Sequence, residues 1–541
     1  MPKFSDEEKI LLAPYVTSTE DDIFAVKGLD GMTGAVYARY SRAPGGFRET
    51  LLKEFIREGA IDAKKAGDLI ERVLIAYGDD SVGELEGAHV SFENISTLST
   101  KEIEDRRIGG SPIEQSTRYV FYDQKNAEGH YRYYRDPAIM ASSHGAAYVE
   151  TMDFIFSTYC ELIPPMKAYY EQLKPLDIAE YDVNGDGAKE RYAELKDEKL
   201  QKAFRTTYQA DIRSKACDAL RALLPLSTLT NVGIFGNGRF FQTVMTHCYS
   251  SAIPEVRDIA ARTQTALDKI IPRYVKRAKA NDYVIETRNA VRALAQALFA
   301  GIAPQEAQTV ALMDRATNER ESDDLTLALM LYPHLNHPLA QIREVVHSLS
   351  DEKRGAIIAT YVGNRKSRRD RPGRAMESGY PYTFDMLVDY GTYKDLERHR
   401  MASQDRQKFT PILGFVVPED IKNAGFAGRV EACREKSVAL YERLAPEFPE
   451  QAPYATLHGS LIRWTLGIND RALMHLIELR TTPQGHPSYR RVAQLMHKAV
   501  AARSSWRAEA MKFADHGDYF WSRADSEAKQ RVKEAALEDG S

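Results

Sequence analysis

The chain has 541 residues, of which 43% are hydrophobic and 28% are charged, and its formal net charge is −4 at pH 7. This balance is typical of a soluble chain of two or more domains, and it argues against disordered, fibrous and generally basic nucleic-acid-binding proteins. The four cysteines form no C-x-x-C pair, so we expect neither disulfides nor a metal site.

The N-terminal residues 1–9 are too charged for a signal peptide, and no later run reaches the roughly 18 apolar residues of a membrane span. We therefore expect a cytoplasmic protein with no membrane partner and no nucleic-acid partner.

The first part of the chain mixes short strands and helices. Apolar spacing predicts a strand at 23–26 and helices at 49–58 and 67–76. A glycine turn at 78–85 leads to a predicted helix that enters 88–90. A further helix is expected at 96–105 and a strand at 119–122.

Residues 146–225 and 254–298 have mostly helical patterning. The hexapeptide 182–187 resembles the start of a calcium loop, but Ala193 stands where a bidentate glutamate is needed and Glu194 comes one place late. We interpret the hexapeptide as a polar surface turn.

The second part begins with a predicted strand at 310–313 and a helical region that runs through 357–360. The basic run 365–374 is interpreted either as a solvated face or as a phosphate-binding loop, because clustered arginines bind anions with charge-assisted hydrogen bonds. Nucleic acid is a weaker reading, since the run has no interleaved aromatics. A helix is expected to end at Glu397, and the last thirty or so residues indicate a helical surface extension.

Two stretches share one pattern. The later one is Arg398-His399-Arg400 followed by Ser403, and the earlier one starts at Arg106. The earlier stretch continues with residues that the later one lacks: Glu114, Ser116, Arg118 and Tyr119. Each stretch keeps motif residues that the other lacks, which predicts that the chain contains two copies of one fold.

These residues make the chain resemble a tandem-duplicated member of the flavin-dependent thymidylate synthase family, whose signature is R-H-R-x-x-S-x-N-E-x-S-x-R-Y. The first copy resembles the distal half and departs from it at Arg107, Ile108 and Ile113. The second copy resembles the proximal half and departs at Asp405, Arg406, Lys408, Thr410 and Pro411.

Downstream spacing agrees with this resemblance. The family has an arginine before Leu-Pro, then Asn-x-Arg, then a further arginine. The first copy offers Arg221, Asn237 and Arg239 but has Cys248 at the last position, whereas the second offers Asn469, Arg471 and Arg480, then His486. The upstream family motif G-H-x-S/T-x-x-E is approximated by Gly78, Ser81 and Glu84, with Asp79 in place of His.

The resemblance implies an α+β fold of two tandem copies, each a mixed or antiparallel sheet with long helices. The expected copies are 1–303 and 304–541, the second with the C-terminal extension. The implied activity is methylation of dUMP with FAD, and with NADPH and methylene-tetrahydrofolate as co-substrates. The implied FAD ligands are Arg398, His399, Arg400, Asn469, Arg471 and His486. The implied nucleotide ligands are Glu114, Ser116, Arg118, Arg221 and Arg480, of which Ser116 and Arg480 are the implied catalytic residues.

We expect a homodimer that forms a pseudo-tetramer, with composite sites where residues of one copy meet residues of the other. Two alternatives stay open: a non-catalytic flavin- or nucleotide-binding descendant, and a flavoenzyme acting on another pyrimidine nucleotide. The composite site requires Ser116, Arg118 and Arg221 to lie within one ligand's length of Arg400, Asn469 and Arg480.

Overall fold

The computed structural model describes residues 4–29, 31–41, 43–57, 60–62, 69, 80–105, 108–367 and 370–521. The chain forms two compact units. Unit 1 comprises Met1–Gln115 and Thr230–Ile285, and unit 2 comprises Ser116–Leu229 and Glu286–Ser541. The units do not coincide with the two expected copies, because residues 116–229 of the first copy belong to unit 2.

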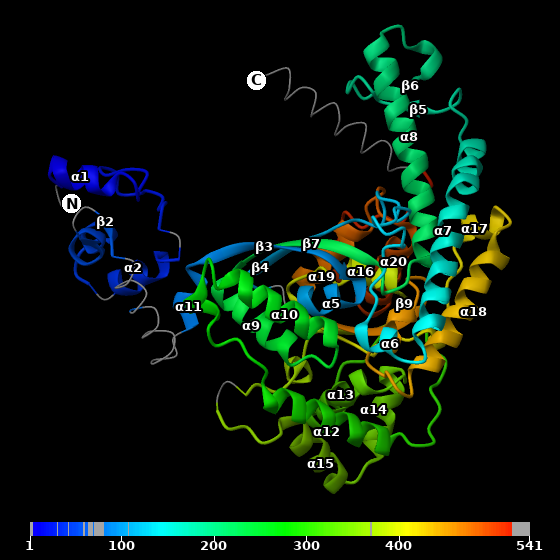
Figure 1. Ribbon diagram of the computed structural model, residues 1–541. Helices are drawn as coiled ribbons and strands as arrows, with labels where there is room; N and C mark the ends of the chain where they lie inside the picture. The colour runs from blue at the N-terminus through cyan, green and yellow to red at the C-terminus, as the bar shows by residue number, and fades with distance from the viewer. Residues whose placement is uncertain are drawn as a thin grey trace. The chain divides into compact units, whose positions relative to one another are not determined.

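Unit 1 contains a three-stranded sheet in the order β3-β7-β4, with β4 and β7 antiparallel. Helices α9 and α10 lie side by side (Figure 1), and their apolar side chains share one core with those of β7. The described elements are α1 (Asp6–Leu12), α2 (Thr33–Tyr40), α3 (Phe47–Thr50), η1 (Leu51–Phe55), β1 (Ile56–Arg57), β2 (Ala60–Ile61), η3 (Asp80–Glu84), β3 (Gly87–Ser96), α5 (Thr97–Glu104), β4 (Gly110–Glu114), β7 (Leu229–Asn237), α9 (Gly238–Tyr249), α10 (Pro254–Leu267) and α11 (Pro272–Val275).

Unit 2 is built on a four-stranded antiparallel sheet in the order β10-β11-β9-β8. Helix α12 (Asp282–Leu298) begins in unit 1 and continues into unit 2. The other described elements of unit 2, in chain order as far as η7, are α6 (Pro137–Ala141), α7 (Gly145–Leu173), β5 (Glu180–Tyr181), β6 (Glu190–Arg191), η4 (Tyr192–Glu194), α8 (Glu198–Leu220), η5 (Arg221–Leu223), β8 (Val310–Leu312), α13 (Glu319–Leu331), η6 (Tyr332–His334), α14 (Leu339–Ser348), α15 (Asp351–Val362) and η7 (Arg374–Glu377).

The rest of unit 2 completes the sheet and carries the helices that position the candidate site. These elements are β9 (Tyr382–Asp389), α16 (Tyr390–Leu396), β10 (Ala402–Arg406), η8 (Pro411–Leu413), α17 (Glu419–Asn423), α18 (Ala427–Leu444), η9 (Ala452–Ala455), β11 (Leu461–Ile468), α19 (Asp470–Arg480), α20 (Pro487–Arg503) and α21 (Ser505–Ala510).

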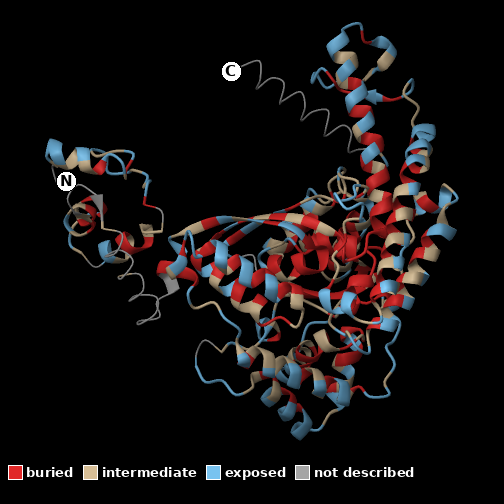
Figure 2. Ribbon diagram, in the orientation of Figure 1, coloured by how far each residue is buried: buried red, intermediate tan, exposed pale blue. Residues whose placement is uncertain are grey.

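The core of unit 2 surrounds the sheet and the long helices. In β11 the side chains of Trp464, Leu466 and Ile468 are buried, as expected for a central strand paired on both sides. Helix α7 packs against both α8 and α18. Figure 2 shows buried residues concentrated on these strands and on the facing sides of the helices. Within the described part of the chain, no helix is long and apolar enough to cross a membrane.

The segments that follow η5 and η9 are joined by two pairs of hydrogen bonds. The N–H of Leu226 donates to the carbonyl of Thr456 at 2.8 Å, and the N–H of His458 donates to that of Leu224 at 2.9 Å. A second pair joins Ser227 to Tyr454 at 3.2 Å and Gly459 to Ala222 at 2.9 Å. An offset of 232 residues exchanges the members of each pair, so two copies of one segment meet about a pseudo-twofold axis inside unit 2.

Strand register supports the same correspondence. Ser111 of β4 pairs with Phe235 of β7, and Ser403 of β10 pairs with Gly467 of β11. Two residues after Phe235 and Gly467, Asn237 and Asn469 cap α9 and α19 with their side-chain oxygens. Each copy therefore has the same strand, cap and helix in the same order, which is the duplication that the sequence predicts.

Several predicted elements are confirmed. Ser96 caps α5 by accepting from the N–H of Ser99, because its hydroxyl satisfies a helical donor that has no carbonyl partner. The predicted helices of 146–225 are α7 and α8, the strand at 310–313 is β8, and the helices that end near 360 and 397 are α15 and α16. The hexapeptide 182–187 is a turn in which Asp182 accepts from the N–H groups of Gly185 and Gly187.

Other predictions of secondary structure are wrong. The helix expected to enter 88–90 is strand β3, where Ala88 and Phe92 point into the core, so the sheet overrides the glycine-led helix signal. Residues 119–122 form turn and loop without a partner strand, and of 23–26 only Val26 makes an isolated bridge. The helix at 49–58 ends in a π-helical turn and a short strand. The helical prediction for 254–298 is confirmed, since this range contains α10, α11 and α12.

Some predictions fall wholly or partly outside the residues that the structure describes. Apart from Leu69, which is helical, the predicted helix 67–76 lies outside the described residues, as do the first two positions of the early motif, Arg106 and Arg107. Of the predicted C-terminal extension, the stretch from Met511 to Trp521 is irregular, and residues 522–541 lie outside the described residues.

Candidate functional site

The ring of Tyr489 lies between two arginines that come from different copies. The guanidinium carbons of Arg118 and Arg480 are each 5.6 Å from the ring centroid. Tyr489 is buried near the start of α20, and Arg480 is the last residue of α19. The fold thus brings first-copy and second-copy residues together within unit 2 of a single chain. We call Arg118, Asp218, Arg221, Asp395, Arg480 and Tyr489 the arginine cluster.

Arg118 is held by Asp218 of α8. Its Nε and Nη2 donate to the two carboxylate oxygens at 2.9 and 3.0 Å, a bidentate pair that fixes the plane of the guanidinium. Burial alone would lower the pKa of Arg118, but the Asp218 carboxylate raises it, so the charge is permanent. Ser116 accepts from the N–H of Arg118 at 3.1 Å and shapes the turn that delivers the arginine.

Arg221 crosses from the end of α8 to the second copy. Its Nη1 donates to Asp395 of α16 at 3.0 Å, and its Nη2 is buried with no hydrogen-bond partner among the described residues. Gly391 leaves room for this reach, since a Cβ there would lie 3.0 to 3.1 Å from the guanidinium atoms. Although burial favours the protonated form of Asp395, Arg221 and Arg118 hold the pKa of its carboxyl well below the usual range.

Arg480 differs from the other two arginines because, among the described residues, no carboxylate lies within ion-pair distance of it. Its Nε donates to Nε2 of His399 at 3.1 Å, which requires that ring nitrogen to carry no proton. Burial lowers the pKa of Arg480. Its charge is thus the least compensated in the cluster and the best suited to a bound anion.

His486 lies against the cluster in its neutral form. Its Nδ1 caps α20 by accepting from the N–H of Ser488 at 3.2 Å, which puts the proton on Nε2, 3.5 Å from the carbonyl oxygen of Asp218. Burial, helped by Arg221, lowers the pKa of His486 to about 3. The imidazole therefore stays uncharged at neutral pH.

The remaining predicted residues are exposed residues of the second copy and Glu114 of unit 1. Arg398, Arg400, Asn469 and Arg471 are exposed, although Arg398 is close enough to help lower the pKa of Asp395. Glu114 belongs to unit 1, where its buried carboxylate lies 3.5 Å from Nζ of Lys101.

Sequence reasoning missed three members of the cluster, namely Asp218, Asp395 and Tyr489. A signal for the two acids was available, since each stands three residues before an arginine, Arg221 or Arg398. The pairing is crossed, because Asp395 binds Arg221 and Asp218 binds Arg118. Spacing could not reveal that crossing, which depends on how the two copies fold together.

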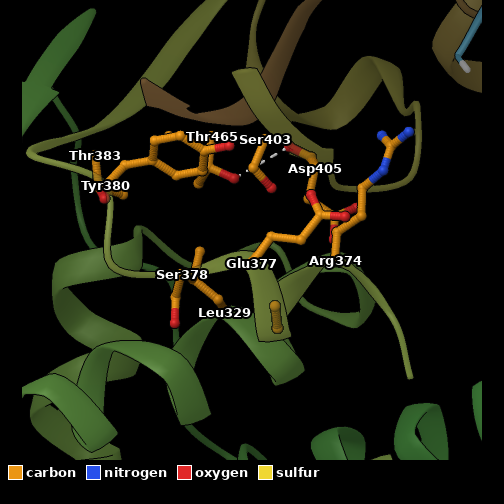
Figure 3. A pocket seen from close by; sticks show the side chains of 11 residues that line it. Leu329, Arg374, Glu377, Ser378, Tyr380, Thr383, Ser403, Asp405 and Thr465 are labelled. Carbon is orange, nitrogen blue, oxygen red and sulfur yellow. Dashed lines mark hydrogen bonds between the residues drawn. The ribbon is translucent and has the colours of Figure 1, made fainter. Parts of the chain in front are cut away.

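A pocket of about 340 Å³, counted with the solvent at its mouth, opens on the sheet of unit 2 (Figure 3). Thr383, Ser403, Asp405 and Thr465 project into it from three strands. A Cβ on Gly467 would lie 2.9 Å from the ring of Tyr380, so this glycine lets the ring lie on the sheet. The motif serine Ser403 therefore faces this pocket.

Arg374, the last residue of the basic run, lines the rim of the same pocket and donates to the carbonyl of Gln404 at 2.8 Å. Within the run, Asp370 accepts from the N–H groups of Lys366 and Ser367. The described residues of the run, 365–367 and 370–374, thus include a turn closed by Asp370, and the proposed binding of phosphate stays a prediction.

Comparison with known proteins agrees with this architecture. Residues 33–273 and 343–504 match the family described as thymidylate synthase complementing protein. The chain belongs to that family. The two matched regions fall in the two expected copies, so the chain is a tandem-duplicated member of it.

Relatives of this family member share its full length. A UPF0159 protein of Chlamydia muridarum (strain MoPn / Nigg) is 35% identical over 98% of this chain and 99% of its own length. A UPF0159 protein of Chlamydia pneumoniae is 34% identical over 98% of both chains. A UPF0159 protein of Thermoplasma acidophilum is 31% identical over 93% of this chain and 99% of its own length. The chain is similar to these proteins across both copies, so the double-length architecture is common to them.

Proposed function

We propose that this protein is a flavin-dependent thymidylate synthase-like enzyme that methylates dUMP, with FAD as cofactor and with methylene-tetrahydrofolate and NADPH as co-substrates. The observation that carries the proposal is the arginine cluster, in which Arg118 and Arg221 of the first copy meet Arg480, His399 and His486 of the second. We infer one composite site for each chain, assembled within unit 2.

Within this site we assign the nucleotide anion to Arg480. Arg118 and Arg221 are each bound to a carboxylate, so both serve first to hold the cluster together. Arg221 still has Nη2 to offer, because that buried nitrogen has no partner among the described residues. Net positive charge remains once His486 is neutral, and it favours a phosphate dianion.

The residues fit a flavin on the exposed side of the cluster. Arg398, Arg400 and Arg471 present guanidinium groups near solvent, where they suit a pyrophosphate. Asn469 would contribute its amide NH₂, since its oxygen caps α19. When bound and reduced by NADPH, the flavin would supply the hydride that reduces the transferred carbon, while the protein orients the nucleotide and excludes water. We assign the Ser116 hydroxyl to the uracil, with no nucleophile required of the enzyme.

The test is release of tritium from labelled dUMP by the full chain with FAD, folate and NADPH. We expect Arg480→Gln to lower kcat/KM for dUMP by about 10²-fold, because a charge-assisted contact to the anion is lost. Arg491→Gln, an exposed change on α20, is the matched control and should leave the rate unchanged. Absence of tritium release from a flavin-loaded protein would overturn the enzymatic proposal.

A second candidate function is binding without catalysis. It is favoured by the two carboxylates, Asp218 and Asp395, which occupy the arginines that the resemblance gives to the nucleotide. This alternative predicts calorimetric binding of dUMP or FAD with no tritium release. Tritium release, measured on the same preparation that binds dUMP or FAD in the calorimeter, separates the two candidates.

A further inference from the structure

The C-terminal stretch from Asp515 to Trp521 crosses from the second copy to the first within unit 2. It starts on α20, where the N–H of Asp515 donates to Oγ1 of Thr481 at 2.9 Å and Arg490 donates to the carbonyl of Gly517 at 3.1 Å. It ends on α7 and α8, where the rings of Phe520 and Trp521 pack near Tyr170. We call Asp515–Trp521 the strap.

Under the strap lies a cleft that leads to the arginine cluster. One wall is a single face of α8, formed by Asp211, Ser214, Lys215 and Asp218. The rest of the lining comes from the loop 483–487 without His486, from Arg118, and from Tyr519 and Phe520 of the strap, which we call the roof rings. The cleft therefore gives access to the Arg118–Asp218 pair from the side of α8.

The lining of the cleft is charged, so the strap covers a polar space. Asp211 is 1% exposed, and its Oδ1 has no hydrogen-bond partner among the described residues. The roof rings bury little of their own area, since Tyr519 is 40% exposed and Phe520 is 42% exposed. A segment held by core packing would bury such rings, so the strap is held by other contacts.

At its start the strap is held by hydrogen bonds, since Arg490 and Gln494 donate to carbonyls of Gly517 and Asp515. At its far end Nζ of Lys215 lies 3.6 Å from the centroid of Phe520, and Nζ of Lys174 lies 4.8 Å from that of Trp521, beside the contacts of both rings with Tyr170. Such cation–π contacts are individually modest, so we expect the far end, Phe520 and Trp521, to open while the start of the strap stays attached.

We propose that the strap is a lid over this cleft, latched to α7 and α8 by Lys174 and Lys215. Closed, it separates the arginine cluster from solvent on the α8 side. Open, it admits a small molecule to Arg118. The proposal concerns access alone and does not depend on which reaction the cluster carries out.

The test measures how fast a thiol under the lid reacts in the full chain. Ser214, 2% exposed on the cleft wall, is changed to cysteine, and its modification by methyl methanethiosulfonate is followed by mass spectrometry of the peptide that contains it. We expect slow labelling in Ser214→Cys alone and labelling about tenfold faster or more when Phe520→Ala and Trp521→Ala are added.

Two further variants test whether a general loosening of the C-terminal segment, rather than loss of the two latch rings, explains faster labelling. Phe513→Ala changes a ring that is 76% exposed just before the strap and should not alter the rate. Trp521→Tyr keeps an aromatic face for Lys174 and should restore slow labelling when Phe520 is kept. Equal rates with and without the latch rings would overturn the lid, whether the common rate is fast or slow.

Discussion

The two copies place the same elements in the same order, yet only the second has an arginine at the end of the helix that follows the asparagine cap. Arg480 of the second copy corresponds to Cys248 of the first by the offset that relates Asn469 to Asn237. His486 and Ile253 correspond as the residues before the proline that starts α20 or α10, and Tyr489 corresponds to Val256. In unit 1 these positions belong to an apolar core, in which Cys248 is 2% exposed and Val256 is fully buried.

Acids are kept at two positions of one segment in both copies. Residues 101–104 and 394–397 read Lys-Glu-Ile-Glu and Lys-Asp-Leu-Glu with the same pattern of burial, so Glu102 corresponds to Asp395. Glu102 pairs locally with His247 at 2.9 Å, whereas Asp395 binds Arg221 across the pseudo-twofold axis. Either arrangement is therefore compatible with the fold, and in the second copy the acid forms its ion pair with an arginine of the other copy.

The largest expected effect comes from Cys248→Arg, which places in the first copy the arginine that the second copy has at the corresponding position. The guanidinium would enter a core lined by Phe240, Met245 and Ile259, so we expect a loss of at least about 4 kcal/mol in the free energy of unfolding. Urea denaturation measures it. The reverse change, Arg480→Cys, removes a charge that has no carboxylate partner among the described residues, and should cost about 1 kcal/mol. Similar losses for the two variants would contradict the contrast.

The retained acids offer a matched pair of isosteric changes. Asp395→Asn leaves Arg221 buried without its counter-ion, so we expect a loss of about 3 to 5 kcal/mol in the free energy of unfolding. Glu102→Gln removes a partly exposed pair and should cost at most about 1 kcal/mol. A denaturant titration of both variants would refute the inequality if Glu102→Gln were the more damaging.

These acids show where prediction from sequence stops. The motif predicted the duplication, and the Asn-x-Arg spacing placed Asn237 and Asn469 at corresponding positions of the two copies. Strand β3 was missed because its pairing with distant β7, rather than local propensity, decides its structure. The partners of Arg118 and Arg221 were missed for a related reason, since Asp395 is far from Arg221 in sequence and the two meet only through the packing of the two copies. Helix caps are local and predictable, whereas buried ion pairs are not.

The pH dependence of stability tests the comparison at His486, because the first copy has the uncharged Ile253 at the same cap. Its pKa is about 3 in the folded chain and near 6.5 when unfolded, so between these values the unfolded state binds more protons. Stability is therefore lost as pH falls below 6.5, by about 2 kcal/mol at pH 5. Urea titrations at pH 7 and pH 5 should show this loss shrink in His486→Asn, where asparagine still caps α20. An unchanged pH dependence in the variant would show that His486 is not the buried neutral group.

The smallest expected effect concerns the asparagine helix caps, which both copies share. Asn237 accepts from the N–H of Phe240 at 2.8 Å, and Asn469 accepts from that of Ala472 at 3.0 Å. Because both caps satisfy the same kind of helical donor, Asn237→Ala and Asn469→Ala should each cost about 1 kcal/mol in flavin-free protein. Adding FAD should enlarge the cost of Asn469→Ala alone, since a ligand that contacts Asn469 stabilises the parent more than the variant. Equal costs with and without FAD would leave Asn469 a helix cap and remove it from the proposed flavin site.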